Sequence, residues 1–267
     1  MKEMVEKVKQ LLRDGDIAGF IGLKEQHGHP VPHVFTRDNM EELESLVIGN
    51  IRYPLTKVLL KVVDRYTDDH FGVMVRGCDE RTLKELFKWN QLHRDRVIPV
   101  GIACPPEQAE ACECPKPYPS EWVTGEKTQG IPKSKRLEER EKLSREERLH
   151  YWTNQFNKCI KCYGCRDVCP MCFCQVCSLE DPSFILTGKI PPENPTFHLA
   201  RAVHMVGRCI DCGLCEEACP VDIAVRILYK KVGEIVSGLF DYRTGEDLEG
   251  RSPLNILGEI PLDRTDM

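Results

Sequence analysis

Two stretches of the chain carry four cysteines each at the same spacing. CIKCYGCRDVCP occupies residues 159–170, and CIDCGLCEEACP occupies residues 209–220. In both runs the first three cysteines recur every third residue, and the fourth is followed directly by a proline. A loop with this spacing presents three thiolates to one polynuclear iron centre. The two runs therefore predict iron–sulfur chemistry at two places.

Zinc is the alternative for these motifs, because four thiolates also form structural zinc sites. A zinc site needs only two cysteines from each knuckle, however. The third cysteine and the trailing Cys-Pro would then have no function in either run. The complete spacing favours iron–sulfur clusters over zinc.

Residues 155–230 resemble the two-cluster bacterial ferredoxins. In that family the first three cysteines of a run bind one 4Fe–4S cluster, and the fourth binds the other cluster. The resemblance implies these ligands: for cluster 1 Cys159, Cys162, Cys165 and Cys219, and for cluster 2 Cys209, Cys212, Cys215 and Cys169. The insert between the runs is longer than in a minimal ferredoxin, which suggests an added site or a partner surface.

The insert begins with CPMCFCQVC, which contributes three further cysteines. Cys172, Cys174 and Cys177 are too closely spaced to be incidental packing residues, and they predict an additional zinc or iron–sulfur site. Its fourth ligand would come from His198, from His204 or from a partner chain. Taken alone, each histidine is more often a surface or hydrogen-bonded residue, so the type of site stays open.

Four more cysteines follow two predicted strands in the first part of the chain. Cys78 follows FGVMV, Cys104 follows VIPVGI, and the next loop holds Cys112 and Cys114. If the strands are parallel neighbours, their carboxyl ends meet at one sheet edge, where open α/β folds bind ligands. A third 4Fe–4S cluster is therefore predicted at Cys78, Cys104, Cys112 and Cys114. The alternatives are zinc at the same residues, or Cys78 and Cys104 as small buried side chains.

The elements that position these cysteines form two predicted domains. Residues 1–115 predict an α/β domain with a small parallel sheet, because short apolar runs alternate with helical patterns. The expected strands are Ile17–Leu23, Phe71–Val75 and Val97–Ile102. One helix is expected from Pro54, and another is expected after Asp79 as its N-cap.

Residues 116–143 predict a linker, because they are rich in proline, glycine and charge. Ser144 and Glu147 predict a capping box that opens an α+β, ferredoxin-like domain over residues 144–245. A long helix is expected from Ile223 to about Phe240. Its predicted apolar stripe is Leu228, Val232, Ile235, Val236 and Leu239. Residues 246–267 predict an extended C-terminal tail.

Composition excludes several classes of protein. The net charge of −5 gives no basic surface for a nucleic-acid partner. The sequence lacks the run of roughly eighteen apolar residues that a membrane span requires. Its first residues, MKEMVEKVKQLLRDGD, predict an amphipathic helix and not a signal or transit peptide. Fifteen cysteines without an export signal indicate metal ligands in a cytoplasmic protein.

A second resemblance covers residues 15–115. RYP, VRGCDERTLKEL and VIPVGIAC are similar to parts of the flavin-bearing β subunit shared by deazaflavin-reducing hydrogenases and some formate dehydrogenases. In that family, cysteine loops like RGC and GIAC lie close to an iron–sulfur centre and a flavin. The resemblance therefore adds FAD to the cofactors to be considered.

The predicted function is electron transfer, because the cysteines are not accompanied by a catalytic triad, paired carboxylates, a GxGxxG fingerprint or a P-loop. We expect an iron–sulfur subunit of a cytoplasmic, anaerobic oxidoreductase complex. It would relay single electrons between a second redox protein and a catalytic subunit of the hydrogenase, formate dehydrogenase or heterodisulfide reductase type. One alternative is a flavin-containing reductase of a deazaflavin or nicotinamide cofactor, and another is a zinc scaffold without redox activity.

Overall fold

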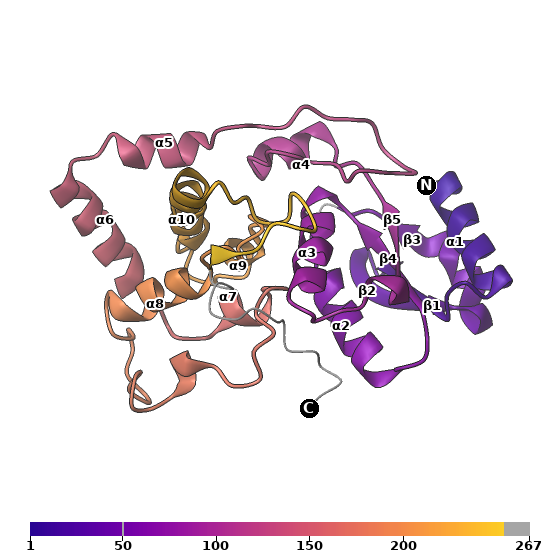
Figure 1. The fold of residues 1–267 in the computed structure, drawn as a ribbon, viewed down its shortest axis with the longest axis horizontal. Helices are drawn as coiled ribbons and strands as arrows, with labels where there is room; N and C mark the ends of the chain where they lie inside the picture. Colours follow the sequence, from indigo (N-terminus) through magenta and orange to yellow (C-terminus); the bar gives the residue numbers. More distant parts are fainter. Residues whose placement is uncertain (50, 254–267) are drawn as a thin grey trace. The chain divides into compact units, whose positions relative to one another are not determined.

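The computed structural model describes residues 1–49 and 51–253. The chain divides into two compact units, the first formed by Met1–Ile131 and the second beginning at Pro132. The first unit contains a β-sheet with helices, and the second contains the helices from α5 to α10 (Figure 1). None of the described helices combines the length and apolarity that crossing a membrane requires.

The sheet of the first unit is mixed. Its strands are β1 (Gly19–Gln26), β2 (His29–Thr36), β3 (Leu46–Val47), β4 (Phe71–Val75) and β5 (Val97–Gly101). The strand order is β2-β1-β4-β5, and β3 also pairs with β1. The prediction of a parallel sheet is correct for β1, β4 and β5, whereas β2 and β3 run antiparallel to β1.

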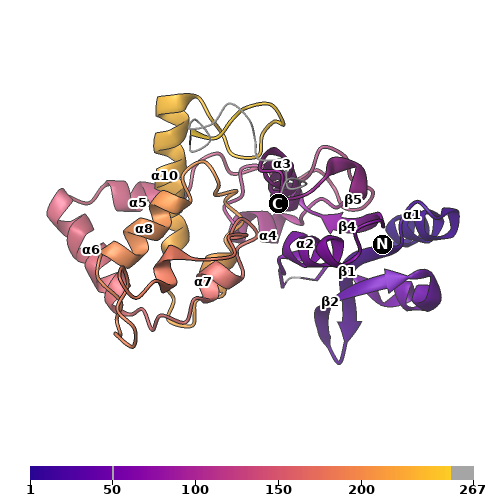
Figure 2. The same cartoon turned by 60° about the horizontal axis from the view of Figure 1, so that its bottom comes forward.

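Strand β2 was not expected from the sequence, because Pro30 and Pro32 interrupt its pattern. Proline cannot donate a ladder hydrogen bond, so it is tolerated only in strands at the edge of a sheet. Strand β2 occupies such an edge and forms a hairpin with β1 (Figure 2). His27 and Gly28 connect the two strands with φ of 53° and 82°, the left-handed values of a tight hairpin turn.

Helices connect the strands of the first unit. They are α1 (Lys2–Asp14), η1 (Arg37–Ser45), α2 (Leu55–Arg65), α3 (Gly77–Lys88), η2 (Arg94–Arg96) and α4 (Pro106–Ala111). Helix α2 follows Pro54 as predicted. Helix α3 begins earlier than predicted, because its N-cap is Arg76 and Asp79 is the third residue of the helix. The Asp79 carboxylate accepts a hydrogen bond from the Arg76 amide at 2.9 Å and so completes a capping box.

Strand β4 lies at the centre of the core of the first unit. All five of its residues are buried, which requires cover on both faces of the sheet. Helices α2 and α3 both pack against it. This packing holds the carboxyl ends of β4 and β5 in place, and these ends precede Cys78 and Cys104.

The second unit consists of helices joined by long loops. Its elements are α5 (Lys135–Glu141), α6 (Arg145–Asn157), α7 (Gly164–Asp167), η3 (Ser178–Glu180), α8 (Thr196–His204), α9 (Leu214–Glu217) and α10 (Val225–Phe240). Helix α10 packs against α5, α8 and α9 (Figure 1). The predicted capping box at the start of α6 is present, since the Ser144 amide donates to Glu147 at 2.7 Å and the Glu147 amide donates to Ser144 at 3.2 Å.

The apolar stripe predicted for α10 is only partly correct. Val236 is buried as predicted, whereas Ile235 and Leu239 are 48% and 73% exposed and Tyr229 is buried instead. Tyr229 and Val236 are two turns apart on one face of the helix, and Ile235 and Leu239 lie to the side of that face. An apolar strip is therefore exposed at the end of the helix.

The segment expected to be a linker contributes to both units. Residues 116–131 pack on the first unit, where Thr124 forms a bridge with Ile102 and the Val123 amide donates to the Gly101 carbonyl at 3.0 Å. Residues 132–143 belong to the second unit and include α5. Of the predicted tail, residues 254–267 lie outside the described residues.

Candidate iron–sulfur sites

The two cysteine runs of the second unit adopt the same backbone conformation. Lys161 and Tyr163 have φ of 54° and 58°, and the equivalent residues Asp211 and Gly213 have φ of 56° and 80°. Left-handed residues at two alternate positions curl each loop, and a short helix follows, α7 in one case and α9 in the other. The sequence repeat is therefore also a structural repeat, and α7 packs against α9.

The residue before each short helix has a left-handed backbone conformation, and it is a tyrosine in the first loop and a glycine in the second. At Gly213 a Cβ atom would lie 3.1 Å from Nη1 of Arg226, so a side chain would meet both backbone strain and a close contact. Tyr163 accepts the left-handed conformation in the first loop. Its hydroxyl donates to the Leu179 carbonyl at 2.8 Å, and its ring meets Phe197 edge to face.

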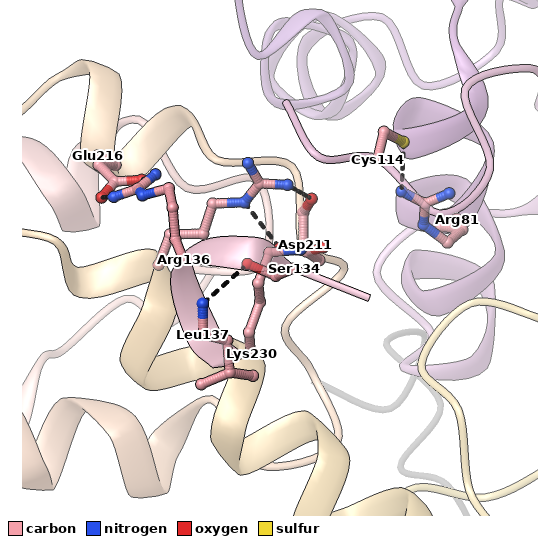
Figure 3. A network of polar contacts seen from close by, with 9 residues as sticks. Arg81, Cys114, Ser134, Arg136, Leu137, Asp211, Glu216 and Lys230 are labelled. Atoms are coloured by element: carbon pink, nitrogen blue, oxygen red, sulfur yellow. Dashed lines mark hydrogen bonds and ion pairs between the residues drawn. The ribbon is translucent and has the colours of Figure 1, made fainter. Parts of the chain in front are cut away.

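Helix α10 holds the second loop in place through ion pairs. The Asp211 carboxylate accepts hydrogen bonds from Nε of Arg226 and from Nζ of Lys230, both at 2.7 Å (Figure 3). Glu216 of α9 pairs with Arg136, which lies on α5. These contacts fix the loop through residues far away in sequence.

Three other thiols influence the pKa of Cys159. Burial raises this pKa, the Lys161 amide lowers it, and the thiols of Cys165, Cys162 and Cys219 raise it further. The end of the second run also packs against the first loop, because a Cβ atom at Gly164 would lie 3.1 Å from the carbonyl oxygen of Ala218, the residue before Cys219.

The second loop has the matching arrangement. Burial raises the pKa of Cys209 to about 12, and Cys212 contributes to this rise. Burial also raises the pKa of Cys215, with Cys212 and Cys209 contributing. Contact with Cys172 and burial raise the pKa of Cys169, and Cys212 adds to them. The end of the first run also contacts the start of the second, since Nη2 of Arg208 donates to the Met171 carbonyl at 3.2 Å.

Buried donors near these cysteines have no acceptor in the part of the chain that the structure describes. They are Nε of Arg201 on α8 and the hydroxyl of Tyr229 on α10, and each residue is 3% exposed. An unsatisfied buried donor costs about 1–3 kcal/mol. The sulfides of an iron–sulfur cluster are acceptors, and cluster sulfurs commonly accept hydrogen bonds. The thiol set and these donors therefore fit a 4Fe–4S group.

Backbone amides also point at the sulfur atoms. The Lys161 amide donates to Sγ of Cys159, and the Ile223 amide donates to Sγ of Cys219, both at 3.4 Å. Such bonds stabilise negative charge on a thiolate. An apolar core surrounds the sulfurs and contains Phe156, Ala202, Ile223, Val225 and Tyr229.

The three remaining thiols of the insert have different neighbours. Sγ of Cys172 accepts a hydrogen bond from Arg201 at 3.4 Å, and Cys177 packs against Leu179, Ile185 and Phe197. Cys174 is exposed. Within residues 1–49 and 51–253, no three histidine, cysteine, aspartate or glutamate side chains are arranged to hold a single metal ion. The extra site at Cys172, Cys174 and Cys177 stays a prediction.

The two candidate histidine ligands differ in environment. His198 is buried, and its ring stacks on that of Phe156 with centroids 4.3 Å apart. Burial, and to a smaller degree Arg201, lower its pKa to about 4, so His198 is neutral at pH 7. His204 is exposed at the end of α8.

In the first unit, the strand register places Cys78 and Cys104 at one sheet edge. Val75 pairs with Gly101 at the ends of the parallel strands β4 and β5. Cys78 lies three residues after Val75, and Cys104 lies three residues after Gly101. Cys78 falls in the first turn of α3. The parallel pairing that the third cluster requires is therefore present.

Cys112 and Cys114 approach the same edge from α4. Burial raises the pKa of Cys104 to about 11 and Arg76 opposes this, while Cys114, Asp79 and Cys112 raise it further. Three of the four predicted ligands are therefore near one another, and Cys78 is next in sequence to Asp79.

Two arginines that the sequence did not single out face this edge. Nη2 of Arg81 lies 3.9 Å from Sγ of Cys114 (Figure 3). Arg76 is buried and donates to the Ile48 and Gly49 carbonyls, and its Nε has no hydrogen-bond partner among the described residues. Arg76 stands two residues before Cys78 and Arg81 stands three residues after it. This closeness to a candidate ligand is the sequence signal that could have pointed to the two arginines.

Parts of this chain are similar to a known domain family and to known proteins. Residues 151–220 match the 4Fe-4S dicluster domain family. The match spans both cysteine runs, so this part of the chain is similar to iron–sulfur domains of the ferredoxin type.

Curated relatives match a further share of the chain. One is the F420-dependent formate dehydrogenase subunit beta of Methanocaldococcus jannaschii, 43% identical over 99 residues, which is 37% of this chain and 26% of that protein. Another is the F420-dependent formate dehydrogenase 1 subunit beta of Methanococcus maripaludis, 44% identical over 113 residues, 42% of this chain and 28% of that protein. The chain thus spans about a quarter of the length of these relatives.

These matches confirm both resemblances drawn from the sequence, to the two-cluster ferredoxins and to the formate dehydrogenase β subunits. They also confirm the coarse fold, a small sheet with helices together with a ferredoxin-type domain, and they support iron–sulfur clusters as cofactors.

Proposed function

We propose that this chain is an iron–sulfur electron-transfer subunit of an oxidoreductase complex. The observation that supports this best is the duplicated cysteine loop, in which left-handed residues recur at the same positions and the two following helices, α7 and α9, pack together. We assign Cys159, Cys162, Cys165 and Cys219 to cluster 1, and Cys209, Cys212, Cys215 and Cys169 to cluster 2. A bound 4Fe–4S cluster would accept and release one electron at a time.

The residues around the two loops would perform three tasks. The left-handed turns orient the thiols, and the Lys161 and Ile223 amides stabilise thiolate charge. The core built around Phe156 and Tyr229 packs against Cys159, Cys165, Cys209 and Cys219 and limits their contact with water, whereas Cys162 is exposed. Hydrogen bonding and solvent exposure are the means by which a protein sets the potential of a cluster.

A third 4Fe–4S cluster at Cys78, Cys104, Cys112 and Cys114 belongs to the same proposal. The strand register and the thiols close to Cys104 support it. Arg76 supplies positive charge and a buried donor at this place. Cys172, Cys174 and Cys177 are proposed as an additional zinc or iron–sulfur site, with the remaining ligand from His198, from His204 or from a partner.

The partners follow from the relatives, which are subunits of formate dehydrogenase by name. We propose a catalytic oxidoreductase subunit as one partner, a second redox protein as the other, and the cytoplasm as the location. Of the catalytic partners considered from the sequence, formate dehydrogenase is the one that these relatives favour.

One observation favours the flavin-containing reductase as a second candidate. A cavity of about 850 Å³ lies in the first unit beside Cys104 and is lined by Ala103, Pro105, Ala109, Gly125 and Lys127 among others. Binding pockets for organic cofactors are typically about 300–1,000 Å³ and mostly apolar. A flavin in this cavity would lie near the proposed third cluster.

The two candidates differ in what the isolated chain does. The full chain, produced anaerobically, should take electrons from dithionite and pass them to a viologen dye. It should not oxidise formate, hydrogen, NADH or a reduced deazaflavin until a catalytic subunit is added. Steady turnover of any of these by the single chain, together with a yellow chromophore released on denaturation, would replace the relay by the flavoenzyme.

A further inference from the structure

Arg201 lies inside the iron–sulfur unit without a carboxylate partner. It belongs to FHLARAVH, which makes up α8 together with the preceding Thr196, and it is 3% exposed. In the part of the chain that the structure describes, its hydrogen bonds go to a carbonyl and a thiol, and it forms no ion pair with an acidic side chain. Burying a guanidinium without a counter-charge is costly, which calls for a compensating negative group.

The contacts of Arg201 point to the cysteine loops. Nη2 donates to the Cys165 carbonyl at 2.6 Å, and Nη1 donates to Sγ of Cys172 at 3.4 Å. Nε is buried and has no acceptor among the described residues. The guanidinium also lies over the ring of Tyr229 at 6.0 Å, whose buried hydroxyl has no acceptor there either.

Arg201 is in contact with the surroundings of both proposed ligand sets. It donates to the carbonyl of Cys165, a proposed ligand of cluster 1. Its guanidinium lies over the ring of Tyr229, which belongs to the same buried apolar cluster as Cys215, a proposed ligand of cluster 2. Cys172, which accepts a hydrogen bond from Arg201, donates its own amide to the Cys169 carbonyl at 3.1 Å. One buried cation is therefore close to both sets.

Arg226 is a second buried arginine of the same unit, and its charge is balanced by a carboxylate. It is also buried near the second loop, but Nε of Arg226 lies 2.7 Å from the Asp211 carboxylate, which also accepts from Lys230. Arg226 thus has a structural partner that accounts for its burial. Arg201 has none among the described residues, so the negative charge that it complements would be that of the bound clusters.

We propose that Arg201 is a positive charge shared by the two clusters, which raises the reduction potential of both. The proposal rests on the proposed function, because it requires that both clusters bind. Reduction adds one electron to a cluster, and a nearby buried cation stabilises the added negative charge. The effect is large because charge interactions are weakly screened away from water. Arg201 is a positioning and tuning residue and would not ligate iron.

The test is an anaerobic redox titration of the full chain with dithionite, followed by EPR. Arg201→Met removes the charge, and Arg201→Lys keeps it. Arg145→Met is the matched control, because Arg145 is exposed at the start of α6, where its charge is screened by water. Iron content is measured for each variant and should be about eight irons for clusters 1 and 2, with about four more where the third cluster binds.

The expected result is a more negative midpoint potential for both clusters in Arg201→Met. The reduction equilibrium should change at least tenfold, which corresponds to about 59 mV for a one-electron couple. Arg201→Lys should recover most of this shift, and Arg145→Met should change both potentials far less. Should Arg201→Met lose iron, Arg201→Gln replaces it, since an amide can still donate to the Cys165 carbonyl.

Unchanged potentials in an iron-replete Arg201→Met or Arg201→Gln protein would overturn the proposal. A shift in only one cluster would overturn the shared role. A wild-type chain that fails to bind two clusters would instead refute the proposed function, so the two failures are distinguishable.

Discussion

At the residue scale, the cysteines of the second unit act across a long separation in sequence. Ala218, which precedes Cys219, lies against Gly164 of the first loop, and Met171, two residues after Cys169, accepts a hydrogen bond from Arg208, which precedes the second run. Each loop thus supplies one thiol to the surroundings of the other loop. If these thiols are ligands, the two clusters are mechanically linked, because removing one fourth cysteine disturbs the cluster of the opposite run.

We therefore predict that Cys219→Ala damages the same cluster as Cys162→Ala. In the same way, Cys169→Ala should damage the same cluster as Cys212→Ala. The reason is the crossed proximity of the fourth cysteines. EPR of the reduced proteins, with iron analysis, identifies which signal each variant loses.

Cys174→Ala is the control for this comparison, because Cys174 is exposed and lies outside both ligand sets. It should retain both signals. The crossed assignment is wrong if Cys219→Ala and Cys212→Ala lose the same signal.

At the element scale, two helical glycines occupy opposite environments. A Cβ at Gly77, at the start of α3, would lie 2.2 Å from the Lys116 carbonyl oxygen. A Cβ at Gly233, within α10, would meet nothing within 4 Å. Replacing the glycine by alanine should therefore destabilise the protein at Gly77 and stabilise it at Gly233.

Gly77→Ala should destabilise the protein by about 1–3 kcal/mol, the usual effect of overpacking. It should also displace the loop that carries Cys112 and Cys114 and so lower the iron bound by the first unit. Gly233→Ala should stabilise α10 by about 0.5–1 kcal/mol, because glycine is a poor helix former. Anaerobic thermal unfolding and iron analysis measure both effects. Equal changes in Tm would contradict the contact at Gly77.

At the scale of the whole molecule, the two units differ in what holds them together. The first has a sheet whose central strand is fully buried. The second has an apolar core arranged around the cysteines, with buried donors that have no acceptor among the described residues. Metal binding contributes directly to folding when the ligands surround the core in this way.

We predict that removing iron with a chelator after mild oxidation unfolds the second unit first. Hydrogen exchange should accelerate in α8 and α10, because buried thiols and donors lose their partners, while β1 and β4 stay protected. Adding iron and sulfide back under reducing conditions is the control and should restore protection. Uniform loss of protection across both units, or none, would contradict this account.

Some features could be predicted from the sequence because their causes are local. The cysteine spacing alone indicated iron–sulfur loops, since neighbouring ligands are set by a few residues of backbone. The capping box at Ser144 and Glu147 is equally local and was predicted correctly. The pairing of β4 with β5 followed from the strand–helix–strand pattern over residues 71–102, because a helical crossover implies parallel neighbours.

Other features depended on contacts between distant residues and were decided only by the tertiary structure. The edge strand β2 carries two prolines that only its place in the sheet explains. Ile235 and Leu239 are apolar by composition, yet packing elsewhere on α10 leaves them exposed. The arginine in FHLARAVH could not be told from a surface cation in the sequence. Its burial beside both cysteine loops arises because α8 packs between segments that are far apart in the chain, and burial determines how strongly a charge acts.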